Sequence, residues 1–259
     1  MSTLSITAIP AFTDNYIWCI DNKSDAVIVD PGTAEPVLQH LKNNNLSLSK
    51  ILVTHHHFDH VGGIADLKKV FPDAEVIGFR DAKIKSLETL VIEGDQVSAL
   101  GLELSVIEVP GHTLDHIAYV TEIESTPRLF CGDTLFSAGC GRLFEGTPHQ
   151  MYQSLKKIKS LPENTLVYCA HEYTLANTAF AKSLMPSNTT LLSYDNECIE
   201  RRNNDLSTIP AVLSTELNIN PFLRETDAEM IDNLHKLGYK ELSKPEDVFA
   251  AARDAKNKA

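Results

Sequence analysis

The sequence predicts an α+β protein in which layered sheets are covered by helices, with a helical domain at the carboxyl end. Short apolar runs of strand length recur through most of the first 170 or so of the 259 residues, and helical patterns fall between some of them. From about residue 175 the strand signals stop, and helical patterns continue to the end. Such a mixed order favours stacked layers over a simple helical bundle.

The expected strands are short runs bounded by polar or turn residues, and the early ones resemble hairpins. They are Ala26 to Val29, Ile51 to Val53, Glu75 to Ile77, Leu102 to Val109, Ile117 to Val120, Leu129 to Cys131 and Leu166 to Cys169. Helices are expected between some of them, where apolar residues recur at helical spacing. These are Glu35 to Lys42, Ile64 to Val70 and Gln150 to Lys159.

The carboxyl-terminal region is predicted to be helical, with polar or proline breaks between its helices. The expected helices are Ala176 to Ser183, Thr190 to Asn203, Pro210 to Leu217, Asp227 to Leu237 and Pro245 to Lys256. We therefore expect two domains, residues 1–174 and residues 175–259.

Composition excludes several classes of partner. The formal net charge of −12 disfavours a surface for nucleic acid or for an anionic membrane, because polyanions are repelled without a local basic patch. The segment that begins Met1-Ser2-Thr3 has no basic stretch followed by a long apolar one, which predicts no secretion signal. The five cysteines are odd in number, scattered and without a CxxC pair, which favours reduced thiols over disulfides. They are Cys19, Cys131, Cys140, Cys169 and Cys198. We expect a cytoplasmic monomer.

The segment from Thr54 to His60 reads Thr-His-His-His-Phe-Asp-His and directly follows the expected strand Ile51 to Val53. Imidazole and carboxylate groups are ligands for zinc, iron and similar ions, so the cluster predicts a metal site; the alternative is a polar surface loop. In an extended segment, alternation places His55 and His57 on one side and His56 on the other. Asp59 and His60 come about one turn later and suit a second ion.

Three further donors each follow an expected strand: His112, Asp133 and His171. Loops at strand ends are where a rigid scaffold brings distant residues together. Taken singly, each is more often a capping or surface residue. With the first cluster they supply about as many donors as two ions need. The simplest assignment, which the sequence alone does not dictate, gives one ion His55, His57 and His112, the other Asp59, His60 and His171, and both ions the bridging Asp133.

Taken together, these seven residues resemble the ligand set of the metallo-β-lactamase superfamily, and within it the chain is similar to the hydroxyacylglutathione hydrolase (glyoxalase II) family. The supporting stretches are Thr13 to Tyr16, Asp30 to Gly32, Gly111 to Thr113, Gly132 to Phe136, Gly139 to Arg142, Ala170 to Thr174 and Asn220 to Arg224. The resemblance implies an αββα sandwich with a dinuclear site at one edge. It also implies two divalent ions, most readily zinc, although iron and manganese suit the same ligands.

The implied activity is hydrolysis of S-(2-hydroxyacyl)glutathione thioesters, chiefly S-D-lactoylglutathione, to glutathione and D-lactate. The expected nucleophile is a hydroxide on the two ions, because a metal lowers the pKa of bound water to about 7. Asp133 is expected to bridge the ions and Asp59 to orient the hydroxide. Two rivals in the same superfamily are a persulfide dioxygenase with a single iron and, against the −12 charge, a nuclease.

By resemblance, glutathione is held by Arg142, Tyr173 and Arg224, with backbone help near Phe144. The helical residues 175–259 would then contribute to substrate binding. Two departures from the family pattern stand out. Arg142 and Phe144 occupy positions where many relatives carry Lys and Tyr, and the residues after Arg224 lack a second basic group that some relatives use. Arginine still has a physical rationale, because its planar fork matches a carboxylate.

Two residues near the cluster each allow two interpretations. Asp30 ends a strand before Pro31-Gly32, and it either hydrogen-bonds the metal loop or only makes a turn. His116 is expected to be a hydrogen-bonded core histidine, with a supporting contact to the metal site as the alternative.

Overall fold

The computed structural model describes residues 4–259, so Met1 to Thr3, the start of the segment expected to carry no secretion signal, lie outside the described residues. The chain divides into two compact units. The first comprises residues up to Glu108 together with Asp115–Gly132, and the second comprises Val109–Leu114 and Asp133–Ala259. These units follow packing, and the expected division into residues 1–174 and 175–259 stays a prediction.

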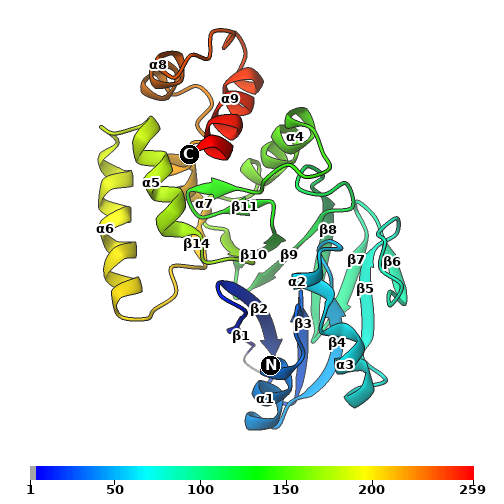
Figure 1. Cartoon of the computed structure of the whole chain (residues 1–259). Coiled ribbons are helices and arrows are strands. Elements are labelled where there is room, and N and C mark those ends of the chain that lie inside the picture. The colour runs from blue at the N-terminus through cyan, green and yellow to red at the C-terminus, as the bar shows by residue number, and fades with distance from the viewer. Residues whose placement is uncertain (1–3) are drawn as a thin grey trace. The chain divides into compact units, whose positions relative to one another are not determined.

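The first unit contains a six-stranded sheet in the order β1-β2-β3-β4-β5-β6 (Figure 1). Its strands are β1 (Ser5–Ala11), β2 (Asn15–Asp21), β3 (Asp25–Val29), β4 (Ser47–Leu52), β5 (Glu75–Phe79) and β6 (Thr89–Val91). The pairs β1-β2 and β2-β3 are antiparallel, while β3-β4, β4-β5 and β5-β6 are parallel. Parallel neighbours need a crossover connection.

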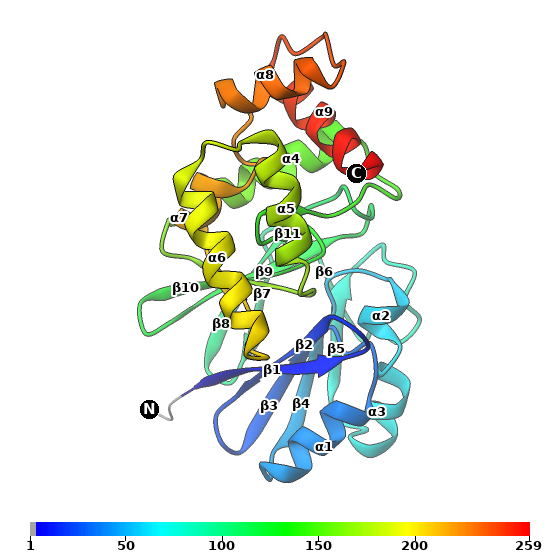
Figure 2. The same ribbon diagram turned by 60° about the vertical axis from the view of Figure 1, so that its left-hand side comes forward.

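Two of the three crossovers in this sheet are formed by helices that cover one of its faces (Figure 2). Helix α1 (Glu35–Asn43) joins β3 to β4, and α2 (Phe58–Val61) with α3 (Ile64–Val70) lies between β4 and β5. The buried side chains of α1 and α3 pack with the inward face of the sheet in one hydrophobic cluster, which includes Val37, Leu41, Leu67, Ile28 and Ile51. The metal-loop cluster of histidines follows β4, so it starts from a rigid strand end.

The first unit also contributes four antiparallel strands to a second sheet, in the order β10-β9-β8-β7. They are β7 (Gln96–Ala99), β8 (Leu102–Glu108), β9 (Ile117–Ile123) and β10 (Thr126–Gly132). Every expected strand and helix of the first unit is present within a few residues at each end, the usual scatter of element boundaries. The sequence did not predict β1, β2, β6, β7 or the short helix α2.

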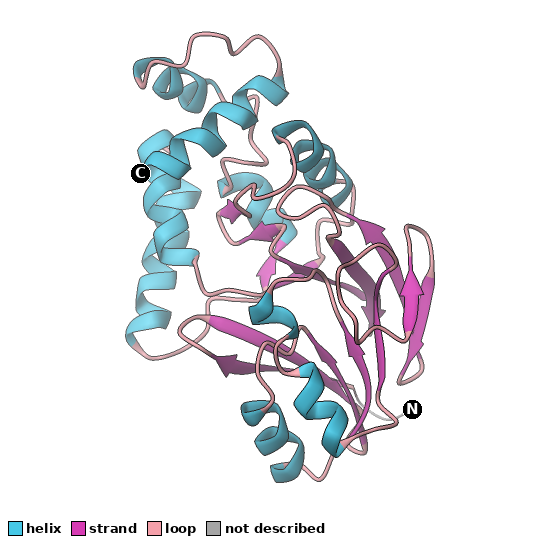
Figure 3. Cartoon of the chain, turned by 45° about the vertical axis from the view of Figure 1, so that its right-hand side comes forward, coloured by secondary structure: helices cyan, strands magenta, loops and turns pink. Residues whose placement is uncertain are grey.

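The second unit is mostly helical, as Figure 3 shows by its cyan coils. Its helices are α4 (Pro148–Lys159), α5 (Thr174–Leu184), α6 (Thr189–Asn203), α7 (Leu213–Ile219), α8 (Ala228–Lys236) and α9 (Pro245–Lys258). Its short strands are β11 (Leu135–Phe136), β12 (Gly139–Cys140), β13 (Leu166–Cys169) and β14 (Ala211–Val212). The helices agree with the expected ones except at one place.

The exception is Pro210 to Leu217, which we expected to be helical throughout. Ala211 and Val212 instead form β14, antiparallel to β13, with Leu166 opposite Val212, and helix α7 begins only at Leu213. The expectation that strands end near residue 175 was therefore wrong here. Two residues are too few to carry a strand period, so the pairing with β13 decides their conformation.

The cysteines behave as the sequence predicts. All five are buried, and none forms a disulfide within residues 4–259. Burial raises the pKa of Cys19 to about 12, with help from the charge of Asp21, and burial raises the pKa of Cys198 to about 11. Thiols with such pKa values are poor nucleophiles at neutral pH. Over the same residues, no helix is both long and apolar enough to cross a bilayer.

Candidate metal centre

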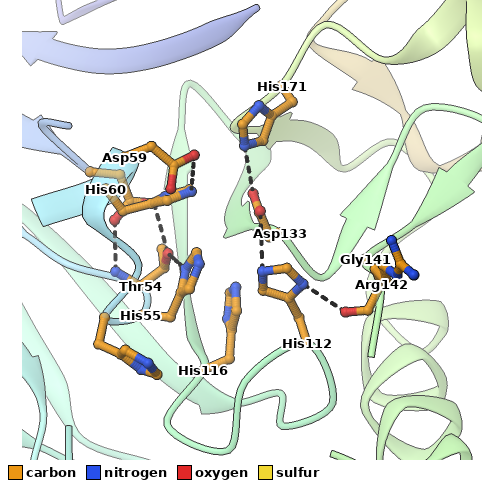
Figure 4. A network of polar contacts seen from close by, with 12 residues as sticks. Thr54, His55, Asp59, His60, His112, His116, Asp133, Gly141, Arg142 and His171 are labelled. Atoms are coloured by element: carbon orange, nitrogen blue, oxygen red, sulfur yellow. Dashed lines mark hydrogen bonds and ion pairs between the residues drawn. The ribbon is translucent and has the colours of Figure 1, made fainter. Parts of the chain in front are cut away.

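Four of the expected donors converge in the first unit (Figure 4). Ligand atoms of His55 lie within 4.8 Å of those of His57 and of His60, and ligand atoms of Asp59 lie within 4.8 Å of those of His60. The ring centres of His55 and His60 are 4.1 Å apart. The short helix α2 carries Asp59 and His60 and turns them back toward His55. The loop thus gathers imidazole and carboxylate groups within a few ångströms.

Asp30 resolves the choice left open by the sequence, because it hydrogen-bonds the metal loop. Its buried carboxylate accepts from the Thr54 backbone N–H at 2.8 Å and from the Thr54 hydroxyl at 2.7 Å. It also lies 3.0 Å from Nδ1 of His60. A carboxylate only accepts, so this contact places the ring proton on Nδ1 and directs the Nε2 lone pair toward a metal.

Asp59 is held from two directions by residues of the first unit. The Asn15 amide donates to its Oδ2 at 3.0 Å. A Cβ atom at Gly32 would lie 1.9 Å from the Asp59 carbonyl oxygen, so only glycine permits the turn after Asp30 to approach this closely. Asn15 was not predicted as a site residue. Its signal, an asparagine opening a strand, is too common to single it out.

The neighbouring histidines have other partners. His56 points to Asp115, with 2.9 Å between Nδ1 and a carboxylate oxygen, and we did not expect it to be a ligand. His116 is buried, its Nδ1 lies 3.0 Å from the Ile117 carbonyl oxygen, and its ring stacks on His55 at 4.5 Å between centres. His116 is therefore a hydrogen-bonded core histidine that also supports His55.

The second unit holds the other three expected donors, all buried. One carboxylate oxygen of Asp133 lies 3.3 Å from Nε2 of His112, and the other lies 3.3 Å from Nε2 of His171. Figure 4 shows the carboxylate between the two rings. Nδ1 of His112 lies 2.8 Å from the Arg142 carbonyl oxygen, which again directs Nε2 toward a ligand. Asp133 thus presents one oxygen to each histidine, as a carboxylate shared by two ions would.

Three of the expected substrate residues lie beside these donors. The exposed Phe144 meets the His112 ring edge to face at 5.2 Å, and the Arg142 guanidinium lies 5.8 Å from the Phe144 ring centre. Tyr173 stacks on His171 at 4.6 Å, and 37 % of it is exposed. A cation and two aromatic rings next to the donors provide contacts for a substrate that carries both charge and apolar surface.

Arg224, the fourth expected substrate residue, has a different setting. Its guanidinium pairs with Asp227, three residues further on. It lines a pocket of about 450 Å³ within the second unit, together with Asn188, Thr190 and Asn218. Its contribution to glutathione binding stays a prediction.

The chemistry of the donors fits divalent metal ions. The donors are imidazole nitrogens and carboxylate oxygens, with ring protons directed away from the converging atoms by Asp30 and the Arg142 carbonyl. Borderline ions such as zinc, iron and manganese take this nitrogen and oxygen set.

Comparison with known proteins agrees with the fold. Residues 12–171 match the family described as the metallo-beta-lactamase superfamily. The solved structure of BLEG-1, a B3 metallo-beta-lactamase, covers 85 % of this chain and 100 % of its own at a TM-score of 0.65 and 23 % identity, which supports the fold alone. ETHE1 from Myxococcus xanthus aligns over 98 % of this chain and 97 % of its own at a TM-score of 0.65 and 25 % identity. Fold and donor set thus define a protein of the metallo-β-lactamase superfamily.

The remaining matches identify the family within this superfamily. Residues 172–259 match the family described as the hydroxyacylglutathione hydrolase C-terminus. A hydroxyacylglutathione hydrolase of Vibrio campbellii is 49 % identical over 98 % of this chain and 99 % of its own length. One from Hahella chejuensis is 48 % identical over 98 % of each. The chain belongs to the hydroxyacylglutathione hydrolase family, and the expected fold class and enzyme class are confirmed.

Replacing Asp30 by asparagine is expected to lower metal affinity by about tenfold to a hundredfold, the usual effect of losing a partner that orients a ligating histidine. Oδ1 of Asp30 accepts from the Thr54 N–H, whereas Oδ2 accepts from the Thr54 hydroxyl and from His60 Nδ1. An asparagine amide has only one oxygen, so its NH2 group must replace one of these two acceptors. Competition with a chelator measures the affinity. Asp21→Asn is the control, a buried aspartate of the same unit that instead accepts from Ser5 and Lys23. Equal metal affinity in wild type and Asp30→Asn would contradict the orienting role.

Proposed function

We propose that the chain hydrolyses S-(2-hydroxyacyl)glutathione thioesters, chiefly S-D-lactoylglutathione, to glutathione and D-lactate at a centre of two divalent metal ions. The observation that carries this proposal is the full-length similarity to hydroxyacylglutathione hydrolases, at 49 % identity over 98 % of the chain, with histidine and aspartate at every expected ligand position. Zinc is the proposed metal, since neutral imidazoles and carboxylates bind it readily.

The proposed ligands of one ion are His55, His57 and His112, and those of the other are Asp59, His60 and His171. Asp133 would serve both ions. Two features support this partition. His55 and His57 have close ligand atoms, as do Asp59 and His60. Asp133 turns one oxygen to each of His112 and His171. Each ion then receives a mixed nitrogen and oxygen set of the kind that such ions prefer.

When bound, the two ions would supply a water acidified to a pKa near 7 and Lewis-acid stabilisation of the charge that develops on the thioester oxygen. The chain's own residues do the rest. Asn15 donates a hydrogen bond that holds Asp59 in place. Asp59 would in turn orient the attacking water by accepting a hydrogen bond from it. The leaving group is a thiolate, whose conjugate acid is far more acidic than an amine. A dedicated general acid is therefore not required.

Glutathione carries two carboxylates, and the chain has a net charge of −12, so local cations must attract it. Arg142 is exposed beside Phe144 and next to His112, where its guanidinium can bind a carboxylate. Tyr173 adds an aromatic face and a hydroxyl beside His171. Arg224 is proposed as a further contact from the helical region, although Asp227 already pairs with it.

A thioesterase assay tests the function. Purified protein is expected to hydrolyse S-D-lactoylglutathione with a higher kcat/KM than simple thioesters that lack glutathione, and chelation is expected to abolish the activity. Equal rates on both kinds of thioester would remove glutathione recognition from the proposal. About one iron per chain, with oxygen uptake on glutathione persulfide, would favour the dioxygenase instead. The resident metal, a cytoplasmic location and a monomeric state stay predictions.

A further inference from the structure

The hairpin β11-β12 (Leu135–Cys140) lies between two proposed site residues in the chain. Asp133, the proposed shared metal ligand, lies just before it, and Arg142, the proposed substrate contact, lies just after it. The hairpin pairs by only two residue couples, Leu135 with Cys140 and Phe136 with Gly139. A two-stranded ribbon this short is not stable by itself. Something else must therefore hold it.

Buried side chains of the helical region hold it by donating hydrogen bonds to its carbonyl groups. Asn220, at the end of α7, donates to the carbonyl oxygens of Phe136 at 3.1 Å and Gly139 at 3.0 Å. Asn177 of α5 donates to that of Ser137 at 3.0 Å. Arg253 of α9 donates to that of Cys140 at 2.8 Å. These three side chains are at most 6 % exposed. They replace the neighbouring strands that a hairpin in a sheet would have.

The turn of the hairpin is held in the same way. Ala138 has a φ of +52°, a conformation that residues with a Cβ atom disfavour. Glu216 of α7, which is fully buried, accepts from the Ala138 N–H at 2.8 Å and from the Ser137 hydroxyl at 3.0 Å. The Asn220 amide donates to the same carboxylate at 2.9 Å. Glu216 and Asn220 therefore act as one bonded pair that keeps the turn in its strained form.

The hairpin transmits this support to the donors at its base. The Gly141 N–H donates to the Thr134 carbonyl oxygen at 3.1 Å, which closes the base of the hairpin. A Cβ atom at Gly141 would lie 1.9 Å from the Asp133 carbonyl oxygen, so the backbone segments before and after the hairpin are in close contact there. The next carbonyl, that of Arg142, is the partner of Nδ1 of His112. A shift of the hairpin would move Asp133, Arg142 and the partner of His112 together.

We infer that Asn177, Glu216, Asn220 and Arg253 are positioning residues. Through the hairpin they hold Asp133 and His112 for metal binding and Arg142 for the substrate. The helical region thus acts on the metal ligands as well as on substrate binding. The part that concerns Arg142 rests on the proposed function, whereas the part that concerns the metal ligands does not.

The test compares Glu216→Leu and Asn177→Ala with Glu216→Gln. Leucine and alanine remove the hydrogen bonds to the turn, so metal affinity is expected to fall by about tenfold to a hundredfold, with a lower kcat and a higher KM for S-D-lactoylglutathione. Glutamine can accept from Ala138 and Asn220 through its oxygen and donate to the Ser137 hydroxyl through its amide. Metal affinity, kcat and KM are all expected to be close to wild type in Glu216→Gln. Metal affinity is measured by competition with a chelator, well below each variant's unfolding temperature.

Thr178→Val is the matched control. Thr178 is buried in α5 next to Asn177, but its hydroxyl oxygen lies 2.5 Å from a carboxylate oxygen of Asp195 and 3.1 Å from the Leu175 carbonyl oxygen. It is expected to lose stability while metal affinity, kcat and KM stay unchanged. Wild-type metal affinity in both Asn177→Ala and Glu216→Leu, or an equal loss in Thr178→Val, would overturn the inference. If Glu216→Leu does not fold, Asn177→Ala and Arg253→Met decide. A wild-type protein without thioesterase activity would refute the proposed function and leave the metal readout intact.

Discussion

Replacing Asp133 by alanine is expected to deplete both metal ions together and to lower kcat/KM by about 1,000-fold or more, equivalent to about 4 kcal/mol of lost transition-state stabilisation. The reason is the position of the carboxylate, with one oxygen 3.3 Å from Nε2 of His112 and the other 3.3 Å from Nε2 of His171. Removing a shared ligand weakens both sites at once. Metal analysis of the purified protein and steady-state kinetics measure the two effects.

Two comparisons make this result specific. His112→Ala and His171→Ala each remove a donor from one proposed ion, so each is expected to deplete one ion before the other. Asp195→Ala removes a different buried carboxylate of the second unit, one that pairs with Lys182, and it is expected to keep the full metal content. Retention of two metals in Asp133→Ala would refute the bridging role.

Replacing Glu216 by glutamine is expected to make the protein more stable than wild type at alkaline pH. The free energy of unfolding of the variant minus that of wild type is expected to be about 3 kcal/mol larger at alkaline pH than at acidic pH. Burial raises the pKa of Glu216 from 4.5 to about 7, against the hydrogen bonds from Asn220, Ala138 and Ser137. The folded state thus holds a proton that the unfolded state releases. The stability that this proton contributes is fully present below about pH 4.5 and is lost as the pH rises through about 7.

Denaturant unfolding at about pH 4.5 and about pH 8 measures this effect, and the difference between the two proteins removes the contributions of all other groups. Glutamine keeps the shape and the hydrogen bonds and has no charge to bury, so its stability lacks this pH dependence. Glu225→Gln is the control, since Glu225 is buried but pairs with Lys159, and losing that pair is expected to give no alkaline gain. A constant difference between wild type and Glu216→Gln across this range would contradict the raised pKa.

The regular elements of the fold were predictable where they carry a full period of apolar residues. Helix α3 and strand β13 have the expected bounds, Ile64–Val70 and Leu166–Cys169. Strands β11, β12 and β14, of two residues each, have no period to detect, and β14 was mistaken for helix. Helix α2, with only four residues, is likewise too short for a periodic signal.

The sequence by itself determined which side chains bring metal chemistry. Four of the donors lie within six residues of one loop after a strand: His55, His57, Asp59 and His60. Because they are so close in the sequence, this loop keeps them close in space. Residue type and spacing along a few residues are local properties. The positions of His112, Asp133 and His171 after strands are local in the same sense, and family resemblance supplied the roles of Arg142, Tyr173 and Arg224.

Only the tertiary structure decided what holds these groups. Asp30 meets His60 across 30 residues, Asn220 meets Gly139 across 81, and Arg253 meets Cys140 across 113. Asn, Glu and Arg on helices usually face solvent, so no pattern in the sequence marks these as buried. Asn220 and Arg253 donate to backbone carbonyl oxygens, which every residue has, so the residue type of the partner does not reveal these hydrogen bonds. Packing alone selects which carbonyl each side chain reaches.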